Sequence, residues 1–286
     1  MPLAPTSRLV AEARAERRGL GAFNVIAIEH AEAIVSGAER AGRPVILQIS
    51  ENAVKFHHGR LAPIALAASA IAKEAAVPVA LHLDHVESES LWRQAPALGF
   101  GSVMVDASKL PYDENVAATA HAVEYLRSHG LYVESELGKV GGKEGEEPLG
   151  AHAPGARTDP DEALSYVEAT GVDALAVAVG SSHAMTSRDA ALDHDLIARI
   201  AAAVPVPLVL HGSSGVPDDE LARAVAAGMV KINIGTALNI AFTGAVREYL
   251  DANPATVDPR KYVKAGREAM ATTVAHFLGV LGGSGA

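Results

Sequence analysis

The stretch PVALHLDH, residues 78–85, is an almost wholly apolar run that ends on a carboxylate, Asp84, and an imidazole, His85. Such a run predicts a strand that is covered on both faces, as in a parallel sheet. Two later runs have the same form: ALAVAVGSSH (174–183) ends at His183, and PLVLHG (207–212) contains His211. Parallel strands deliver their carboxyl ends to one edge of a sheet, so we expect the three imidazoles to meet there, where they could hold a divalent metal.

Strand-like runs recur along the whole chain, and helical segments separate them. We expect strands at 21–26, 44–50, 78–85, 102–108, 132–138, 174–180, 207–212 and 230–235. We expect helices in the N-terminal segment 1–21, at 30–42, 63–76, 113–130, 159–171 and 218–228, after Ala237, and again from about Val263 onward. Several of them end at glycine, a common helix stop. Eight such units in 286 residues predict one α/β domain over residues 1–286, a (β/α)8 TIM barrel. An open doubly wound sheet is the alternative, but the first strand–helix junction has no GxGxxG element.

One segment, GKVGGKEGEEPLGAHAPGART at residues 138–158, interrupts this alternation. It is rich in Gly, Pro and Glu and has no hydrophobic period. A loop of this length within a compact domain is usually functional or disordered. We interpret it as a mobile loop over the mouth of the barrel.

Composition excludes several classes of protein. The formal net charge is −10 without a cluster of Lys and Arg, so neither a nucleic acid nor an anionic membrane surface is the expected partner. No apolar run reaches the roughly 18 residues of a membrane span, and the N-terminus mixes Arg with Glu, unlike an export signal. The absence of cysteine excludes disulfides, thiolate ligands and cysteine nucleophiles, and it fits the cytoplasm, where we expect the protein.

The polar residues at the expected strand ends indicate a metal site. Active sites of TIM barrels lie where strands end and loops begin. The polar residues at these positions are Asp84, His85, Asp106, Glu136, His183, His211, Asn233 and Thr236. Imidazoles without thiolates suit Zn²⁺, with Co²⁺, Mn²⁺ or Fe²⁺ as alternatives. Asp106 and Glu136 are either hydrogen-bond partners of the ligating imidazoles or ligands of a second metal position.

Two short turns indicate phosphate binding. HGSSG (211–215) and NIGT (233–236) place small residues and hydroxyls after the seventh and eighth expected strands. Barrels often bind a phosphate group there through backbone N–H groups. The two turns lie beside an expected metal ligand, which favours a phosphorylated substrate.

Five segments are similar to the signature segments of the class II, metal-dependent ketose-bisphosphate aldolases. They are LHLDH (81–85), VESELGKVGG (133–142), VAVGSSH (177–183), LVLHGSSG (208–215) and VKINIGTAL (230–238), and the resemblance keeps its order from about residue 20 to 275. It implies reversible cleavage of fructose or tagatose 1,6-bisphosphate to dihydroxyacetone phosphate and glyceraldehyde 3-phosphate. It also implies a catalytic Zn²⁺, often with Na⁺ or K⁺ nearby. Another phosphorylated ketose remains an alternative substrate.

The resemblance also implies roles for individual residues. The zinc ligands would be His85, His183 and His211, and a second or displaced metal position would use Asp106 and Glu136. Asp84 would exchange a proton with the C4 oxygen, and Glu144 would handle the proton on the dihydroxyacetone-phosphate carbon. Asn233 would lie beside the enediolate.

The substrate-binding positions that the resemblance implies are Asn24, Ser50, Ala184, Gly212, Ser213, Ser214, Asn233, Ile234, Gly235, Thr236 and Arg260. The arginine would reach the second phosphate from a neighbouring subunit, which implies a homodimer or a homotetramer. Two positions depart from the family pattern: Ala184 replaces a usual glycine, and Gly235 replaces a frequent aspartate.

Three other functions remain open. Lys231, in the eighth expected strand, could form a Schiff base with a ketose, although a buried pairing with an acid such as Glu134 is the simpler interpretation. A metal-dependent hydrolase on the same barrel would also use histidines at strand ends. A third alternative is a protein that binds metal or sugar phosphate without turnover.

Overall fold

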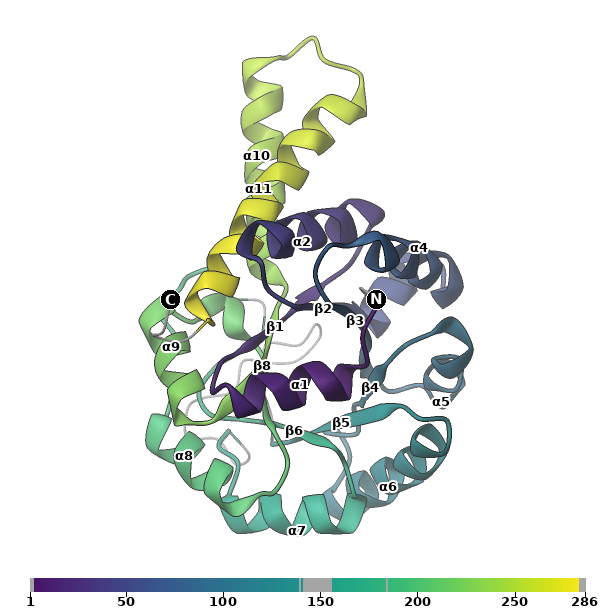
Figure 1. The fold of residues 1–286 in the computed structure, drawn as a ribbon, viewed down its shortest axis with the longest axis vertical. Coiled ribbons are helices and arrows are strands. Elements are labelled where there is room, and N and C mark those ends of the chain that lie inside the picture. The colour runs from purple at the N-terminus through teal and green to yellow at the C-terminus, as the bar shows by residue number, and fades with distance from the viewer. Residues whose placement is uncertain (1–2, 139, 141–155, 184, 283–286) are drawn as a thin grey trace.

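The structure is a computed structural model that describes residues 3–138, 140, 156–183 and 185–282. Its centre is a closed barrel of parallel strands paired in chain order, with the last strand paired to the first (Figure 1). The strands are β1 Leu20–Asn24, β2 Val45–Ser50, β3 Val79–Val86, β4 Ser102–Val105, β5 Tyr132–Leu137, β6 Ala174–Val177, β7 Leu208–Leu210 and β8 Met229–Ile234. Closure confirms the TIM barrel and shows that the open-sheet alternative is wrong.

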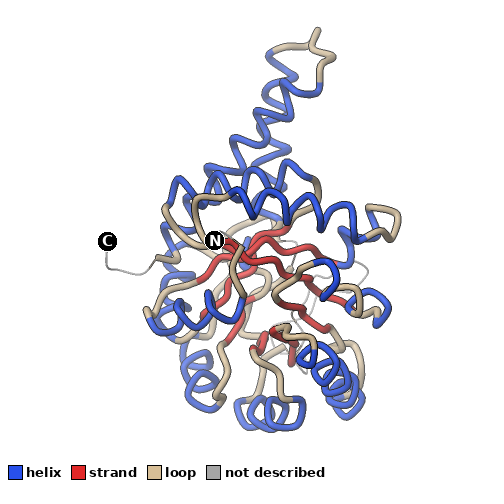
Figure 2. Tube along the Cα trace, turned by 45° about the vertical axis from the view of Figure 1, so that its right-hand side comes forward, coloured by secondary structure: helices blue, strands red, loops and turns tan. Residues whose placement is uncertain are grey.

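Helices surround the barrel, as the blue outer layer of Figure 2 shows. They are α1 Thr6–Ala15, α2 Ile28–Ala41, α3 Glu51–Phe56, α4 Leu61–Glu74, α5 Glu89–Trp92, α6 Tyr112–Ser128, α7 Pro160–Thr170, α8 His194–Ala203, α9 Asp218–Ala227, α10 Thr236–Ala252 and α11 Pro259–Val280. Two 3-10 turns, Pro96–Leu98 and Ser213–Gly215, complete the set. Each expected helix is present with shifted ends, whereas α3, α5 and α8 were not expected; the first two are too short to show a helical period.

The expected segment 138–158 falls largely on residues 139 and 141–155, which lie outside the described residues. Its last part leads into α7, whose start is well defined. The side chain of Asp159 accepts hydrogen bonds from the backbone N–H groups of Asp161 and Glu162, and Pro160 occupies the first helical position. This is a standard helix N-terminus, because it satisfies donors that have no partner within the helix.

The barrel interior changes character along its axis. At the amino-terminal ends of the strands, α1 closes the barrel with an apolar cluster in which Leu9 and Val10 meet Leu20 and Ile46. Strand register then places polar side chains in the layers above, since Ile46 pairs with Ala80, Gln48 with His82 and Ser50 with Asp84. The fold therefore seals one end of the barrel and collects polar groups at the other.

Helices α10 and α11 form a hairpin that extends beyond the barrel (Figures 1 and 2). The part of α11 near the barrel packs on α2, where Gly37 would place an added Cβ 2.5 Å from the carbonyl oxygen of Ala271. Beyond this contact, α10 has Leu238 as its fully buried residue, and Ile240 and Val257 are exposed. Much of the hairpin surface thus remains uncovered in a single copy of the chain.

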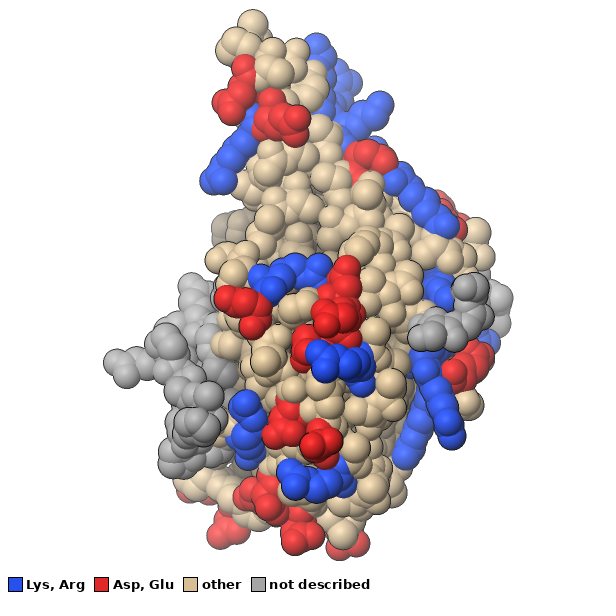
Figure 3. Space-filling model, turned by 90° about the vertical axis from the view of Figure 1, so that its left-hand side faces the viewer, with Lys and Arg blue, Asp and Glu red and all other residues tan. Residues whose placement is uncertain are grey.

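The surface carries interspersed charges of both signs on the face shown in Figure 3. Among the exposed ion pairs, Arg188 pairs with Asp218, and Arg223 pairs with Asp219 and Glu220. None of the described helices is both long enough and apolar enough to cross a membrane.

Candidate metal centre and active site

A cavity of about 850 Å³ opens at the carboxyl ends of the strands. Its lining includes twelve of the residues expected there: Asn24, Ser50, Asp84, His85, Asp106, His183, Gly212, Ser213, Ser214, Asn233, Gly235 and Thr236. They come from the carboxyl ends of seven different strands and the loops that follow them. The barrel therefore assembles in one place residues that are up to about two hundred positions apart in sequence.

Three imidazoles meet beside this cavity: His85 and His183 line it, and the fully buried His211 lies against them. The ring centroids of His85 and His211 are 4.7 Å apart, those of His85 and His183 5.1 Å, and those of His183 and His211 5.7 Å. Each ring offers one nitrogen, and these nitrogens lie within 4.8 Å of one another. Small rotations of the side chains would bring them to bonds of about 2.0–2.1 Å with one Zn²⁺. The donor set therefore fits a divalent cation with three protein ligands.

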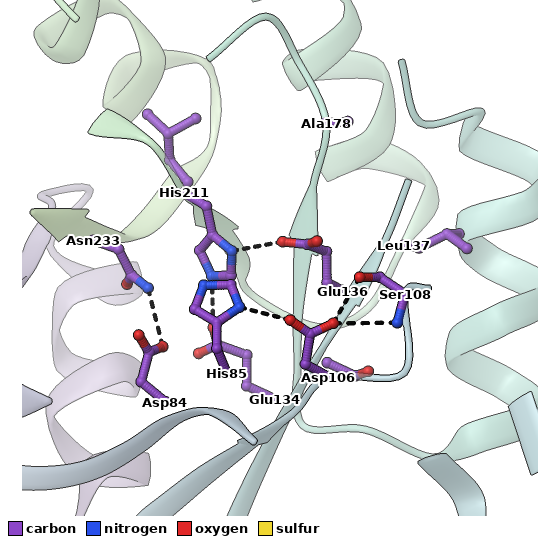
Figure 4. Close-up of polar contacts among 12 residues, drawn as sticks. Asp84, His85, Asp106, Ser108, Glu134, Glu136, Leu137, Ala178, His211 and Asn233 are labelled. Atoms are coloured by element: carbon purple, nitrogen blue, oxygen red, sulfur yellow. Dashed lines mark hydrogen bonds and ion pairs between the residues drawn. The ribbon is translucent and has the colours of Figure 1, made fainter. Parts of the chain in front are cut away.

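Two carboxylates fix the orientation of two of these rings (Figure 4). The Nδ1 atom of His85 lies 2.8 Å from Oδ2 of Asp106, and Nδ1 of His211 lies 2.7 Å from Oε2 of Glu136. Ser108 in turn donates its hydroxyl to Oδ1 of Asp106 at 2.6 Å. Such partners select the tautomer and hold the ring of a ligating histidine. Of the two roles considered for Asp106 and Glu136, this geometry favours that of hydrogen-bond partners.

The backbone at His85 explains how neighbouring residues both reach the site. Successive side chains of a regular strand point to opposite faces, so Asp84 and His85 should diverge. Instead, His85 has a positive φ of 49°, and the pairing of β3 with β4 shifts register between Leu83 and Val86. Irregular pairing of this kind re-aims side chains and is common near active sites. Both Asp84 and His85 consequently line the cavity.

Asp84 is buried beside the imidazoles and an amide. Its Oδ1 lies 3.4 Å from the donating Nδ2 of Asn233 (Figure 4). Burial tends to raise the pKa of Asp84, but the adjacent His85 and the Lys231 ammonium hold that pKa well below its usual value. Asp84 is therefore ionised at neutral pH and able to accept a proton.

A layer of buried charge lies directly beneath the imidazoles. The Nζ atom of Lys231 is 2.8 Å from Oε2 of Glu134, and Oε1 of Glu134 is 3.2 Å from Nε2 of His211. Burial opposes ionisation of Glu134, yet Lys231 and His211 lower its pKa to about 2. Burial likewise opposes a charge on His211, but hydrogen bonds to Glu134 and Glu136 raise its pKa to about 9. The expected pairing of Lys231 with Glu134 is thus confirmed.

Two turns of small residues line the cavity where β7 and β8 end. The 3-10 turn Ser213–Gly215 follows β7, and α10 begins at Thr236 directly after Gly235. The hydroxyl of Ser214 accepts hydrogen bonds from the backbone N–H groups of Gly235 and Ala237 at 3.3 and 3.1 Å, which ties the two turns together. A helix N-terminus beside a turn of small residues is well suited to an anion.

The close approach of Asn24 explains why position 235 is a glycine. An added Cβ would lie 2.9 Å from Oδ1 of Asn24, which already accepts a hydrogen bond from Nε2 of Gln48 at 2.7 Å. The departure from the family pattern therefore makes room for the Asn24–Gln48 pair, so a larger residue would require that pair to move.

Several expected site residues are not in the described cavity. Glu144 and Ala184 lie outside the described residues. The side chain of Ile234 is fully buried in the apolar core. Arg260 is 89% exposed near the tip of the α10–α11 hairpin and bonds Asp258. Arg260 therefore does not line the cavity of its own chain.

The sequence reasoning missed Gln48, which is buried and lines the cavity. The sequence could have indicated it, because Gln48 lies two residues before Ser50 in β2 and residues two apart in a strand face the same side, here the barrel interior. It also missed two lysines in the lining, of which Lys55 pairs with Glu51 at 3.2 Å and Lys109 pairs with Glu87 at 2.8 Å. These lie on loops and a short helix, where hydrophobic periodicity gives no signal.

Comparison with known proteins gives a consistent result. The family model described as "Fructose-bisphosphate aldolase class-II" matches residues 4–286. A fructose-bisphosphate aldolase of Thermus caldophilus is 39% identical over 300 residues, which cover 97% of each chain. Among solved structures, the YdjI aldolase of Escherichia coli K12 is 31% identical with a TM-score of 0.83, covering 99% of this chain and 98% of its own. The fructose-bisphosphate aldolase of Campylobacter jejuni is 25% identical with a TM-score of 0.78, covering 96% and 93%.

Proposed function

This chain belongs to the class II fructose-bisphosphate aldolase family and is therefore an aldolase, and we propose that it uses Zn²⁺ to cleave fructose or tagatose 1,6-bisphosphate reversibly. The products would be dihydroxyacetone phosphate and glyceraldehyde 3-phosphate. The observation that carries this proposal is the cluster of His85, His183 and His211 at a cavity that the carboxylate of Asp84 also lines. That set combines a metal site with a group that can accept a proton.

The chemistry requires both parts. When the C3–C4 bond of a ketose breaks, its electron pair stays on C3, next to the C2 carbonyl. His85, His183 and His211 would hold a divalent metal, and its Lewis acidity would stabilise the negative charge that develops on the carbonyl side. We assign Asp84 to accept the C4 hydroxyl proton as the aldehyde forms, and to return it in the synthetic direction. The amide of Asn233 lies within reach of Asp84 and would orient both the carboxylate and the substrate.

The remaining assignments rest on the sequence resemblance together with local geometry. The backbone N–H groups around Gly212, Ser214 and Thr236 would bind the phosphate on the dihydroxyacetone side, with Na⁺ or K⁺ nearby. Glu144 would deliver the proton to carbon. We propose that Arg260 reaches the second phosphate of a substrate bound to a neighbouring subunit in a homodimer or homotetramer, since it is exposed and does not line its own cavity. We place the protein in the cytoplasm.

A second candidate is an aldolase that acts on another phosphorylated ketose. Within the described part of this chain, the cationic side chains that line the cavity besides the histidines are Lys55 and Lys109, and both already pair with glutamates. A second phosphate would therefore depend on the neighbouring subunit. If that contact is absent, a ketose with a single phosphate is the better substrate.

The Schiff-base alternative finds no support in the geometry. The amine of Lys231 is buried, lies 2.8 Å from a carboxylate and does not line the cavity. A metal-dependent hydrolase would share the histidines but would not need the phosphate-type turns, and the family comparison favours the aldolase.

Turnover with and without chelator tests the proposal. Zinc-loaded protein should cleave at least one of fructose 1,6-bisphosphate, tagatose 1,6-bisphosphate and fructose 1-phosphate, and chelator should abolish the cleavage. Asp84→Ala should keep its metal and lose roughly 10²–10⁴ in rate, the usual size of a positioned acid–base contribution. Rapid turnover of the chelated protein, or of Asp84→Ala, would refute the corresponding assignment. Inactivation by borohydride in the presence of substrate would instead reveal a lysine intermediate.

A further inference from the structure

Lys231 is a fully buried cation for which the proposed reaction has no direct use. It lies in β8, two residues before Asn233, and its side chain is 1% exposed. Its Nζ atom contacts both oxygens of Glu134, at 2.8 and 3.1 Å. Burying an ion pair in a barrel interior is costly, and an apolar pair of similar volume is often at least as stable. Its presence directly below the cavity therefore calls for a role other than stability.

On one side, the ion pair reaches a proposed metal ligand. Glu134 contacts Lys231 and also lies 3.2 Å from Nε2 of His211. The opposite nitrogen of the same ring contacts Glu136. In this structure the ring of His211 lies between two carboxylates (Figure 4), and Lys231 holds one of them in place. Because Nδ1 faces Glu136, Nε2 is the atom that would bind the metal, so Glu134 must give up its contact with this nitrogen when metal binds and keep its contact with Lys231.

On the other side, the same ammonium reaches His82 below Asp84. The Nζ atom of Lys231 lies 3.4 Å from Nε2 of His82. An ammonium only donates, so this nitrogen must accept, and the ring must carry its proton on Nδ1. That assignment agrees with the other contact, since Nδ1 lies 2.7 Å from the hydroxyl of Ser102, which is 2.8 Å from the hydroxyl of Thr6.

The contact with Lys231 determines whether His82 can donate a hydrogen bond to Asp84. The Nε2 atom of His82 is 3.6 Å from Oδ1 of Asp84, which is too long for a hydrogen bond, and its lone pair already faces the ammonium. His82 therefore packs against the carboxylate without neutralising it. If the ammonium were removed, Nε2 would be free to take the proton and donate it to Asp84.

We propose that Lys231 is a positioning residue that couples the metal ligand His211, through Glu134, to the proton acceptor Asp84, through His82. This inference rests on the roles proposed above for His211 and Asp84. It predicts that one substitution changes metal binding and proton transfer together, although Lys231 contacts neither the metal site nor the cavity.

The experiment compares Lys231→Met with the double variant Lys231→Met/Glu134→Gln. The double variant removes both charges of the pair, so we expect it to fold even if the single variant does not. The readouts are the visible absorption spectrum of the Co²⁺-loaded protein and the Co²⁺ affinity from competition with a chelator, followed by kcat and KM at saturating metal. We expect a changed spectrum, metal affinity weakened about 10–100-fold, and a fall in kcat with KM little changed.

A matched control separates positioning from general destabilisation. The hydroxyl of Tyr166 is also buried in a polar cluster, with Asn115, Thr119 and Ser135 at 2.7–2.9 Å, and none of these contacts the imidazoles. Tyr166→Phe should lower the melting temperature while leaving the Co²⁺ spectrum and affinity unchanged. An unchanged spectrum and affinity in both Lys231 variants would overturn the proposal. Because these two readouts need no substrate, they remain decisive even if the protein cleaves no ketose bisphosphate.

Discussion

Replacement of Gly212 by alanine should damage the metal site through a single added methyl group. Gly212 follows β7 with φ of +66°, and an added Cβ would lie 2.5 Å from both the carbonyl carbon and oxygen of Ser182. Ordinary contact begins near 3.4 Å, so the backbone at Ser182 would have to retreat by about 0.9 Å. The next residue is His183, one of the three imidazoles, and the displacement is therefore passed directly to a proposed ligand.

The magnitude has two separable parts. The left-handed backbone conformation itself costs an L-residue about 1–2 kcal/mol. The displacement comes in addition, and misplacement of a reacting or ligating group by about 1 Å can cost roughly 10²-fold in rate. We therefore expect Gly212→Ala to weaken metal binding and to lower kcat/KM by about two orders of magnitude, beyond its effect on stability.

Gly42→Ala is the matched control. Gly42 ends α2 with φ of +62°, and an added Cβ there would meet nothing within 4 Å. Both variants carry the same backbone strain, and only Gly212→Ala carries the contact with Ser182. Thermal unfolding, Co²⁺ competition and steady-state kinetics on the two proteins isolate that contact. Equal metal affinity and kcat/KM in the two variants would refute the link between the turn after β7 and His183.

Three further predictions follow from the pKa shifts and the glycines. In metal-free protein the pKa of His211 is raised to about 9, so a metal ion must displace a proton to bind. The apparent metal affinity should therefore increase up to roughly tenfold per pH unit between about 6.5 and 9. A metal affinity that does not change with pH in chelator competition would contradict this. The pKa of Glu134 is lowered to about 2, so its contribution to stability is complete above the ordinary value of 4.5 and is lost as pH falls toward 2. Urea unfolding between pH 2 and 5 should therefore be less pH-dependent in Lys231→Met/Glu134→Gln than in the unmodified protein. Gly37→Ala should lower the melting temperature, because its Cβ would lie 2.5 Å from the carbonyl oxygen of Ala271. Gly279→Ala, whose Cβ would meet nothing within 4 Å, should raise the melting temperature slightly. The reverse order would show that α11 packs differently.

The sequence predicted the fold well because buried parallel strands and their helices carry strong local signals. Apolar runs such as 78–85 and 174–180 correspond to β3 and β6, although the structure ends β6 at Val177. The shortening has a physical reason: pairing stops where the loops turn toward the cavity, and apolar character continues beyond that point. Hydrophobicity marks burial, and it does not mark where a ladder of hydrogen bonds ends.

The site was predictable to the level of strand ends and no further. Polar residues at strand ends pointed to the three imidazoles and to Asp84. The hydrogen-bond partners of the imidazole rings could not be predicted in this way, because they depend on distances between strands. The hydrogen bond between Asp106 and His85 is such a case. The positive φ at His85 was also beyond reach, because regular alternation would have sent Asp84 and His85 to opposite faces.

The layers of the barrel interior explain why the buried charges of Lys231 and Glu134 lie between the apolar base and the imidazoles. The lower layer around Leu20 and Ile46 is apolar, and α1 seals it, which supplies stability without chemistry. The middle layer holds Lys231 and Glu134, which gain little for stability when buried as a pair. The top layer holds the imidazoles, whose geometry must be kept within a few tenths of an ångström to bind one cation. A rigid charged layer between an apolar base and a metal site is therefore best understood as a support. This explains why its neutral replacement should preserve folding and impair only what lies above it.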